Sequence, residues 1–109
     1  MTVEHVIDDL INNLEEIPPE LADMSAIYEL RISGHQAVTY QLKIENQELE
    51  WVKGTPFMPT CIFLLADTDF LTMVAGELNP KLAIMKGQIK IQGDYGQALE
   101  LNAILKKYY

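Results

Sequence analysis

The N-terminal residues carry apolar side chains at helical spacing. These side chains recur at intervals of three and four residues, at Val3, Val6, Ile7, Leu10, Ile11 and Leu14. The spacing places them on one face of an amphipathic helix of about three to four turns. Pro18-Pro19 follows, and proline cannot continue a helix. The pattern therefore predicts an N-terminal helix that packs one face against the rest of the protein.

The next segments alternate between apolar and polar residues, as half-buried strands do. Residues 26–32 and 38–44 are two such runs, and residues 49–51 form a third, in which Leu and Trp flank a glutamate. The turns between them, 33–35 and 45–47, are short. Because short turns join neighbouring antiparallel strands, this part of the chain predicts a three-stranded meander.

From residue 61 an apolar run changes to helical spacing. Residues 61–66 predict a strand. The helix after it is predicted from apolar residues at helical spacing, namely Phe70, Leu71, Val74 and Leu78. Asp67 lies where the pattern changes, and its carboxylate can accept hydrogen bonds from free amides of the first turn. We therefore expect Asp67 to be the N-cap, with Asp69 as a first-turn acid favoured by the helix dipole.

Three further signals place the last elements. Asn79-Pro80 predicts the start of a short helix, since Asn caps and Pro fits the first position, and Gly87 predicts its end. Residues 88–92 alternate like a strand, and Gly93-Asp94 predicts a turn and the cap of a final helix. The order predicts an α+β fold within a single domain, residues 1–109. It consists of one twisted, mainly antiparallel five-stranded sheet with its helices packed on one face.

The strand at residues 61–66 is apolar on both faces. The other strands are expected to turn polar side chains away from the helices, at Glu29, Arg31, Gln41, Lys43, Glu48, Glu50, Lys90 and Gln92. At residues 61–66 the equivalent side chains are Ile62 and Leu64. A strand that is apolar on both faces is usually covered on both. We therefore expect either a loop to cover Ile62 and Leu64 or a second subunit to do so in a homodimer.

Charge and cysteine content narrow the partners and the compartment. The net charge is −8, with 16 acidic and 8 basic residues, whereas nucleic acids and anionic membranes attract clustered Lys and Arg. We therefore expect no nucleic-acid partner. No apolar run reaches the roughly 20 residues of a membrane span, and no secretory signal is visible. The single cysteine, Cys61, lies in an apolar strand, which predicts a buried, unreactive thiol and a cytoplasmic protein.

The residue types needed for catalysis are sparse. Acidic pairs are explained by helix caps and by the solvent face of the first helix, and neither His5 nor His35 has partners at metal-ligand spacing. We therefore predict no catalytic residues, no metal and no cofactor. Apolar residues of the second half are expected to face inward, among them Phe57, Met58, Phe63, Leu65, Met73, Ile84, Met85, Ile89, Ile91 and Leu101.

Four runs in the C-terminal half follow one another in a characteristic order. They are Ala66-Asp67-Thr68-Asp69-Phe70-Leu71, Gly76-Glu77-Leu78-Asn79-Pro80, Met85-Lys86-Gly87-Gln88-Ile89-Lys90-Ile91 and Gly93-Asp94-Tyr95-Gly96. In this order the chain resembles the sterol carrier protein 2 (SCP2) family, and specifically a small, stand-alone, prokaryotic-type member. The resemblance implies a non-enzymatic lipid-binding domain with an apolar cavity between a sheet and its helices.

The resemblance also implies a site and a range of ligands. By position, the lipid-binding residues would be Phe70, Leu71, Val74, Leu78, Met85, Leu99 and Leu105. The ligand would be a fatty acid, an acyl thioester, a phospholipid or an isoprenoid-type molecule. The first helix carries acidic residues on its polar side, so we expect no strong docking on anionic membranes. The alternative is an accessory module of the same fold, used for dimerisation or protein interaction, with a filled core. The residues alone do not decide between the lipid-binding protein and the accessory module.

Overall fold

The computed structural model describes residues 2–13 and 24–105. Its elements are α1 (Val3–Asn13), β1 (Ala26–Ser33), β2 (Val38–Glu45), β3 (Glu48–Lys53), β4 (Cys61–Ala66), α2 (Asp67–Val74), α3 (Pro80–Met85), β5 (Ile89–Gly93) and α4 (Tyr95–Leu105). Their order confirms the prediction. Leu14 and Pro18-Pro19, the predicted end of the first helix and its stop, lie outside the described residues.

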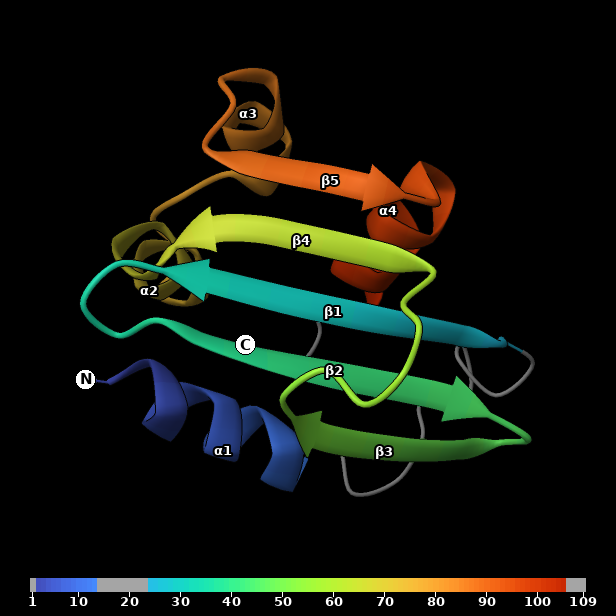
Figure 1. The fold of residues 1–109 in the computed structure, drawn as a ribbon. Helices are drawn as coiled ribbons and strands as arrows, with labels where there is room; N and C mark the ends of the chain where they lie inside the picture. Colours follow the sequence, from blue (N-terminus) through green and yellow to red (C-terminus); the bar gives the residue numbers. More distant parts are fainter. Residues whose placement is uncertain (1, 14–23, 106–109) are drawn as a thin grey trace.

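The strands form one sheet in the order β3-β2-β1-β4-β5 (Figure 1). β1 pairs with β2, β2 with β3 and β4 with β5 in antiparallel fashion, whereas β1 and β4 are parallel. The hairpin between β2 and β3 turns at Asn46 and Gln47, which both have positive φ, as in two-residue hairpin turns. The predicted α+β fold with a mainly antiparallel five-stranded sheet is therefore confirmed.

Two predicted helix caps are present in the structure, and one helix is shorter than predicted. The Asn79 Oδ1 atom accepts hydrogen bonds from the amides of Lys81 and Leu82, and Asp94 Oδ1 accepts one from the Gln97 amide. Both predicted caps are thus confirmed. The helix predicted to continue to Leu78 instead ends at Val74.

The early end of α2 has a local cause at Gly76. This residue adopts a φ of 80°, a left-handed conformation that favours glycine. The Glu77 amide then donates to the Thr72 carbonyl at 3.0 Å, a pattern that closes a helix C-terminus. Leu78 therefore lies beyond α2, although it still packs against the core.

Asp67 is not the N-cap of α2, and this prediction was wrong. The N-cap is Ala66, in an extended conformation, and Asp67 is the first helical residue. Its Oδ1 accepts from the Thr68 amide at 2.7 Å, while its Oδ2 accepts from the Gln36 amide at 2.9 Å. Gln36 in turn accepts a hydrogen bond from the Val3 amide at its Oε1 atom. The Asp67 carboxylate therefore joins α2 to the β1–β2 turn, and Gln36 joins that turn to α1.

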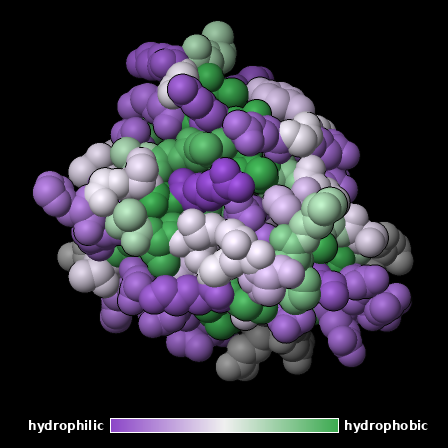
Figure 2. Space-filling view, in the orientation of Figure 1, coloured by the Kyte–Doolittle hydropathy of each residue, from purple (hydrophilic) through white to green (hydrophobic). Residues whose placement is uncertain are grey.

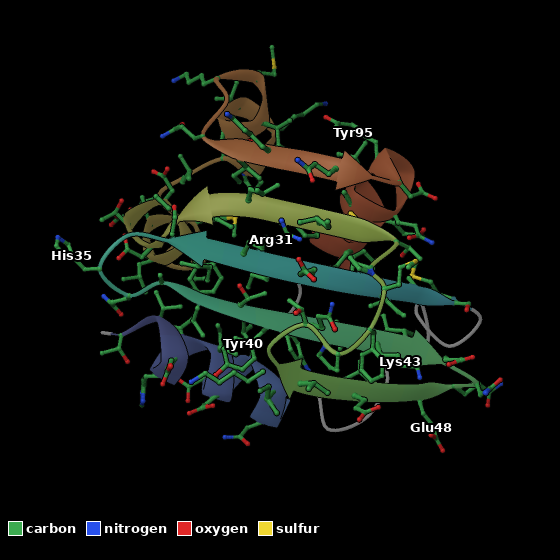
Figure 3. All side chains as sticks on the ribbon, in the orientation of Figure 1. Arg31, His35, Tyr40, Lys43, Glu48 and Tyr95 are labelled. Atoms are coloured by element: carbon green, nitrogen blue, oxygen red, sulfur yellow. The ribbon has the colours of Figure 1, made fainter. Side chains whose placement is uncertain are left out.

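Gly34 makes room for this carboxylate. It has a φ of 107°, and a Cβ atom placed on it would lie 2.5 Å from Asp67 Oδ1. His35, the next residue, projects away from the body of the protein at the same turn (Figure 3).

The outer face of the sheet is the one that carries Glu29, Arg31, Gln41 and Lys43. Figure 2 shows this side, where hydrophilic side chains surround smaller apolar areas. The chain between β3 and β4, residues 54–60, crosses this face in front of β2 and β1 (Figure 1). Glu29 and Gln41 face outward as predicted, but they are 1% and 0% exposed. The sequence pattern did not reveal that the crossing segment would bury them.

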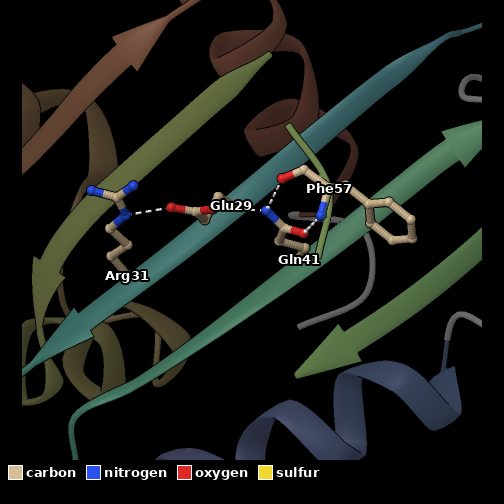
Figure 4. A network of polar contacts seen from close by, with 4 residues as sticks. All are labelled: Glu29, Arg31, Gln41 and Phe57. Carbon is tan, nitrogen blue, oxygen red and sulfur yellow. Dashed lines mark hydrogen bonds and ion pairs between the residues drawn. The ribbon is translucent and has the colours of Figure 1, made fainter. Parts of the chain in front are cut away.

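Gln41 fastens the crossing segment to the sheet (Figure 4). Its Nε2 donates to the Phe57 carbonyl at 2.9 Å and to Glu29 Oε1 at 2.7 Å, and its Oε1 accepts from the Phe57 amide at 2.9 Å. The half-exposed Arg31 pairs with the other oxygen of Glu29. Lys43 Nζ lies 4.6 Å from the centre of the Phe57 ring, a cation–π contact. The buried polar groups of this face are thus paired with one another.

The inner face of the sheet carries the core. One cluster joins α1, through Val3, Val6, Ile7 and Leu10, to Ile32, Tyr40, Leu65, Phe70, Ala83 and Ile89. A second cluster joins Ala98 and Leu101 of α4 to Ala26, Tyr28, Leu42, Ile44 and Cys61. In Figure 1, α2 and α4 lie behind the sheet, on the side opposite the crossing segment.

We expect Gln41→Leu to lower the free energy of unfolding by about 2–4 kcal/mol, because it leaves the Phe57 amide and carbonyl and a Glu29 oxygen without their partner. Urea denaturation followed by circular dichroism measures the change. Gln92→Leu is the matched control, since Gln92 is exposed on the same face, and its effect should stay within about 0.5 kcal/mol. A Gln41→Leu loss no larger than that of the control would show that the fastening is unimportant.

The Asp67 contact should make stability dependent on pH. The Gln36 amide, more than any other group, holds the pKa of the Asp67 carboxyl below its usual value. This stabilisation is fully present above the ordinary Asp pKa of about 3.9 and is lost as pH falls through the lower folded-state pKa. Asp67→Asn should therefore destabilise the protein at pH 7, and the difference from wild type should shrink towards pH 2.

The measurement is the urea midpoint of both proteins between pH 7 and pH 2. Asp69→Asn serves as the control, because Asp69 shares the first turn of α2 but not the Gln36 contact. A midpoint difference between wild type and Asp67→Asn that stays constant over this range would contradict the assignment.

Candidate functional site

An apolar cavity of about 100 Å³ lies on the inner side of the sheet. Each described helix and strand contributes to its wall. The sheet provides Tyr28, Leu30, Tyr40, Leu42, Trp51, Phe63, Leu65 and Ile89. The helices provide Leu10, Phe70, Met73, Val74, Pro80, Ile84, Ala98, Leu99 and Leu101. None of these residues carries a charged side chain, so the site is suited to apolar molecules.

The structure places the seven predicted binding residues differently from one another. Phe70, Val74 and Leu99 line the cavity. Leu71 and Leu78 pack against the core next to it but are not among the described lining residues. The side chain of Leu105 lies outside the described part of the structure. A role in binding a lipid remains a prediction for each of these residues.

Met85 and Met58 were expected to face inward, and both expectations were wrong. Met85 is 77% exposed and Met58 is 87% exposed. The short helix α3 buries Pro80 and Ala83, and Ile84 lines the cavity. These residues occupy the side of the helix that faces the core, so the neighbouring Met85 points away from it. Met58 belongs to the segment that crosses the outer face, on the other side of the sheet from the cavity. Phe57 lies in the same segment with its ring against Lys43, so the inward position expected for Phe57 was also wrong.

The binding residues implied by the resemblance come from the helices and the segments beside them. The residues that the sheet contributes to the cavity wall were not predicted. Trp51 illustrates the missed signal, because its position opposite Leu42 puts it on the inner face. Alternation along the strands had already assigned this face, and any side chain on it beneath a cavity becomes part of the wall. The register between strands, which sequence does not provide, shows which of these residues lie together.

Most buried polar groups around the cavity are satisfied. The Tyr28 hydroxyl donates to the Gln97 carbonyl at 3.0 Å, which ties β1 to α4, and burial raises the pKa of this phenol. Among buried side-chain nitrogen and oxygen atoms of the described residues, Trp51 Nε1 is the one without a hydrogen-bond partner.

Reactive groups are few in the part of the chain that the structure describes. Cys61 is buried, as predicted, and burial raises the pKa of its thiol to about 11. The thiol is therefore almost wholly protonated at neutral pH and is a poor nucleophile. Within residues 2–13 and 24–105, no group of three His, Cys, Asp or Glu side chains is placed to hold a metal ion. None of the described helices is long and apolar enough to cross a membrane.

Ile62 and Leu64 lie on the outer face and are half-buried. Ile62 sits between Glu29 of β1 and Gln92 of β5 in the strand register, and Leu64 sits between Arg31 and Lys90. Polar neighbours thus flank the apolar pair on both sides. A homodimer through these two residues remains a prediction.

Comparisons with known proteins agree with this architecture. The model of the SCP-2 sterol transfer family matches residues 7–106. Hydroxysteroid dehydrogenase-like protein 2 of Xenopus laevis is 36% identical over 80 residues, which are 72% of this chain and 19% of that protein. Human sterol carrier protein 2 is 29% identical over 68 residues, which are 62% of this chain and 12% of that protein.

A solved structure shows the same fold. The solution structure of palmitated SCP2L2 from Aedes aegypti superimposes with a TM-score of 0.79 at 18% identity, covering 96% of this chain and 95% of that one. The chain spans about a fifth of the Xenopus relative and about an eighth of the human one. Because the family model covers nearly all of the described residues, this chain belongs to the SCP-2 sterol transfer family.

Proposed function

We propose that this chain is a non-enzymatic lipid-binding or carrier protein that holds its ligand in the cavity between sheet and helices. The cavity itself is the observation that carries the proposal, because an apolar space lined by every described element is suited to an apolar ligand. A fatty acid, an acyl thioester, a phospholipid or an isoprenoid-type molecule would fit this chemistry. The palmitated state named for the Aedes aegypti neighbour supports an acyl chain as one member of this group.

The energetics of such binding are favourable. Each buried methylene contributes about 0.8 kcal/mol, so ten of them supply about 8 kcal/mol before the entropy of association is subtracted. The cavity, at about 100 Å³, is comparable with an engineered cavity of roughly 150 Å³ that binds benzene. It accommodates a segment of a chain, and a whole long-chain lipid requires the walls to move apart.

Two features of the wall favour such expansion. Met73 lines the cavity with an unbranched, adaptable side chain. Leu99 also lines it yet is 44% exposed, so the cavity reaches the surface beside α4. We propose this position as the entrance for the ligand.

Three further proposals concern catalysis, location and assembly. The dehydrogenase named in the Xenopus relative is not carried over, since this chain spans 19% of that protein. A cytoplasmic location is supported by the lone, buried Cys61 thiol. A protein-interaction module with a filled core is disfavoured by the cavity, although a dimer through Ile62 and Leu64 would be compatible with lipid binding.

Filling the cavity should abolish binding. Ala98 is 1% exposed and lines the cavity, so Ala98→Met would place extra atoms in the space proposed for the ligand. We expect it to weaken the binding of the methyl ester of 12-NBD-stearate at least about 10-fold, at a cost in stability of about 1–3 kcal/mol from overpacking. Fluorescence titration measures the affinity, and circular dichroism shows that the variant is folded.

Ala75→Met is the matched control, because Ala75 is exposed just after α2. It should bind the probe as the wild type does. Equal affinities of the wild type and a folded Ala98→Met would place the ligand elsewhere, and a wild type that binds no apolar probe would refute the proposed function.

A further inference from the structure

Trp51, one of the residues that line the cavity, carries a polar atom in its indole nitrogen. It lies on β3 opposite Leu42 of β2, on the inner face of the sheet, and lines the cavity. Its Nε1 atom is buried and has no hydrogen-bond acceptor among the described residues. The indole nitrogen can only donate a hydrogen bond. A buried donor without an acceptor is costly and rare in native proteins, so this one requires an explanation.

A bound water is a poor explanation. A buried water is stable where two to four polar groups hold it. Apart from Tyr28 and Tyr40, the other described lining residues have apolar side chains. The Tyr28 hydroxyl donates its one hydrogen to the Gln97 carbonyl, so few polar groups are left to hold a water. An acceptor that arrives as part of an apolar ligand satisfies the indole without needing further polar partners.

The residues that line the cavity also favour an uncharged acceptor. No Lys, Arg or His is among the described residues that line the cavity, and the chain as a whole carries a net charge of −8. An ionised carboxylate next to Trp51 would be buried without a counter-ion, which is strongly unfavourable. A neutral oxygen, such as an ester, thioester or ketone carbonyl, carries no such penalty.

We propose that the Trp51 indole is the hydrogen-bond donor that selects a lipid carrying an uncharged carbonyl or ether-type oxygen acceptor. This inference rests on the proposed function, since it assumes that the ligand occupies the cavity. It narrows the ligand class to neutral, acceptor-bearing lipids and places ionised fatty acids below them in affinity.

Three probes of equal chain length separate the alternatives: methyl hexadecanoate, hexadecanoate at pH 8 and hexadecane. The first carries a neutral acceptor, the second a charged one and the third none. The chain has a single tryptophan, so one indole N–H signal in a ¹⁵N NMR spectrum reports on this site alone. Methyl hexadecanoate should shift that signal downfield, whereas hexadecane should perturb cavity methyl groups without a downfield shift.

Affinities of a variant provide the second readout. Trp51→Phe keeps an aromatic ring but removes the donor, so methyl hexadecanoate should bind roughly 3- to 10-fold more weakly while hexadecane binding changes little. Tyr95→Phe is the control, because Tyr95 is exposed at the start of α4 and is not among the described lining residues. The wild type should also bind methyl hexadecanoate more tightly than hexadecanoate.

The outcomes distinguish the role of Trp51 from the proposed lipid binding. Binding of methyl hexadecanoate that is unchanged in Trp51→Phe, or the same indole shift with hexadecane as with the ester, would overturn the role of Trp51 and leave the proposed function standing. Tighter binding of hexadecanoate than of the ester would overturn the selection for a neutral acceptor. Failure of the wild type to bind all three probes would refute the proposed function and this inference with it.

Discussion

The parallel pairing of β4 with β1 determines the path of the chain between β3 and β4. β3 ends at one edge of the sheet, and β4 is added on the far side of β1, so the chain between them must cross β2 and β1. The distance is about 14 Å at the usual strand spacing, which residues 54–60 span without being fully extended. The crossing covers the outer face and buries Glu29 and Gln41 there. These two side chains, with the Phe57 backbone, satisfy the polar groups that the crossing would otherwise leave unpaired.

The cavity lies on the opposite face of the sheet from the crossing segment. With residues 54–60 on the outer face, α2 and α4 lie on the inner face, where the aromatic and aliphatic side chains of the strands converge. Asp67 and Gln36 link α1, the β1–β2 turn and α2, which fixes the wall at one end. The Tyr28 hydroxyl and the Gln97 carbonyl tie α4 to β1 and fix it at the other. The space between these ties is enclosed on one side by the sheet and on the other by helices, and no charged side chain lines its described wall.

The elements of this fold could be predicted from sequence because their signals are local. Alternation of apolar and polar residues predicted the strands. Helix ends depend on neighbouring residues alone, and they were predicted from Asn79, Pro80, Gly87 and Asp94. Asp67 was misassigned because its partner, Gln36, is 31 residues away in the chain. Burial of Gln41 and exposure of Met58 depend on the crossing segment, and exposure of Met85 depends on which side of a short helix meets the sheet. Part of the cavity wall was predicted, since the resemblance pointed to Phe70, Val74 and Leu99. Trp51 was not predicted, because its place in the wall depends on the strand register.

An apolar ligand in the space between the inner face of the sheet and the helices would contact a different methionine from a ligand bound on the surface. Met73 lines the cavity, whereas Met58 and Met85 are exposed on the surface. In a protein labelled with ¹³C at its methionine methyl groups, addition of methyl hexadecanoate should shift the Met73 signal and leave those of Met58 and Met85 in place. Shifts of the Met58 or Met85 signals with an unchanged Met73 signal would show that the lipid binds to the surface and would contradict binding in the cavity.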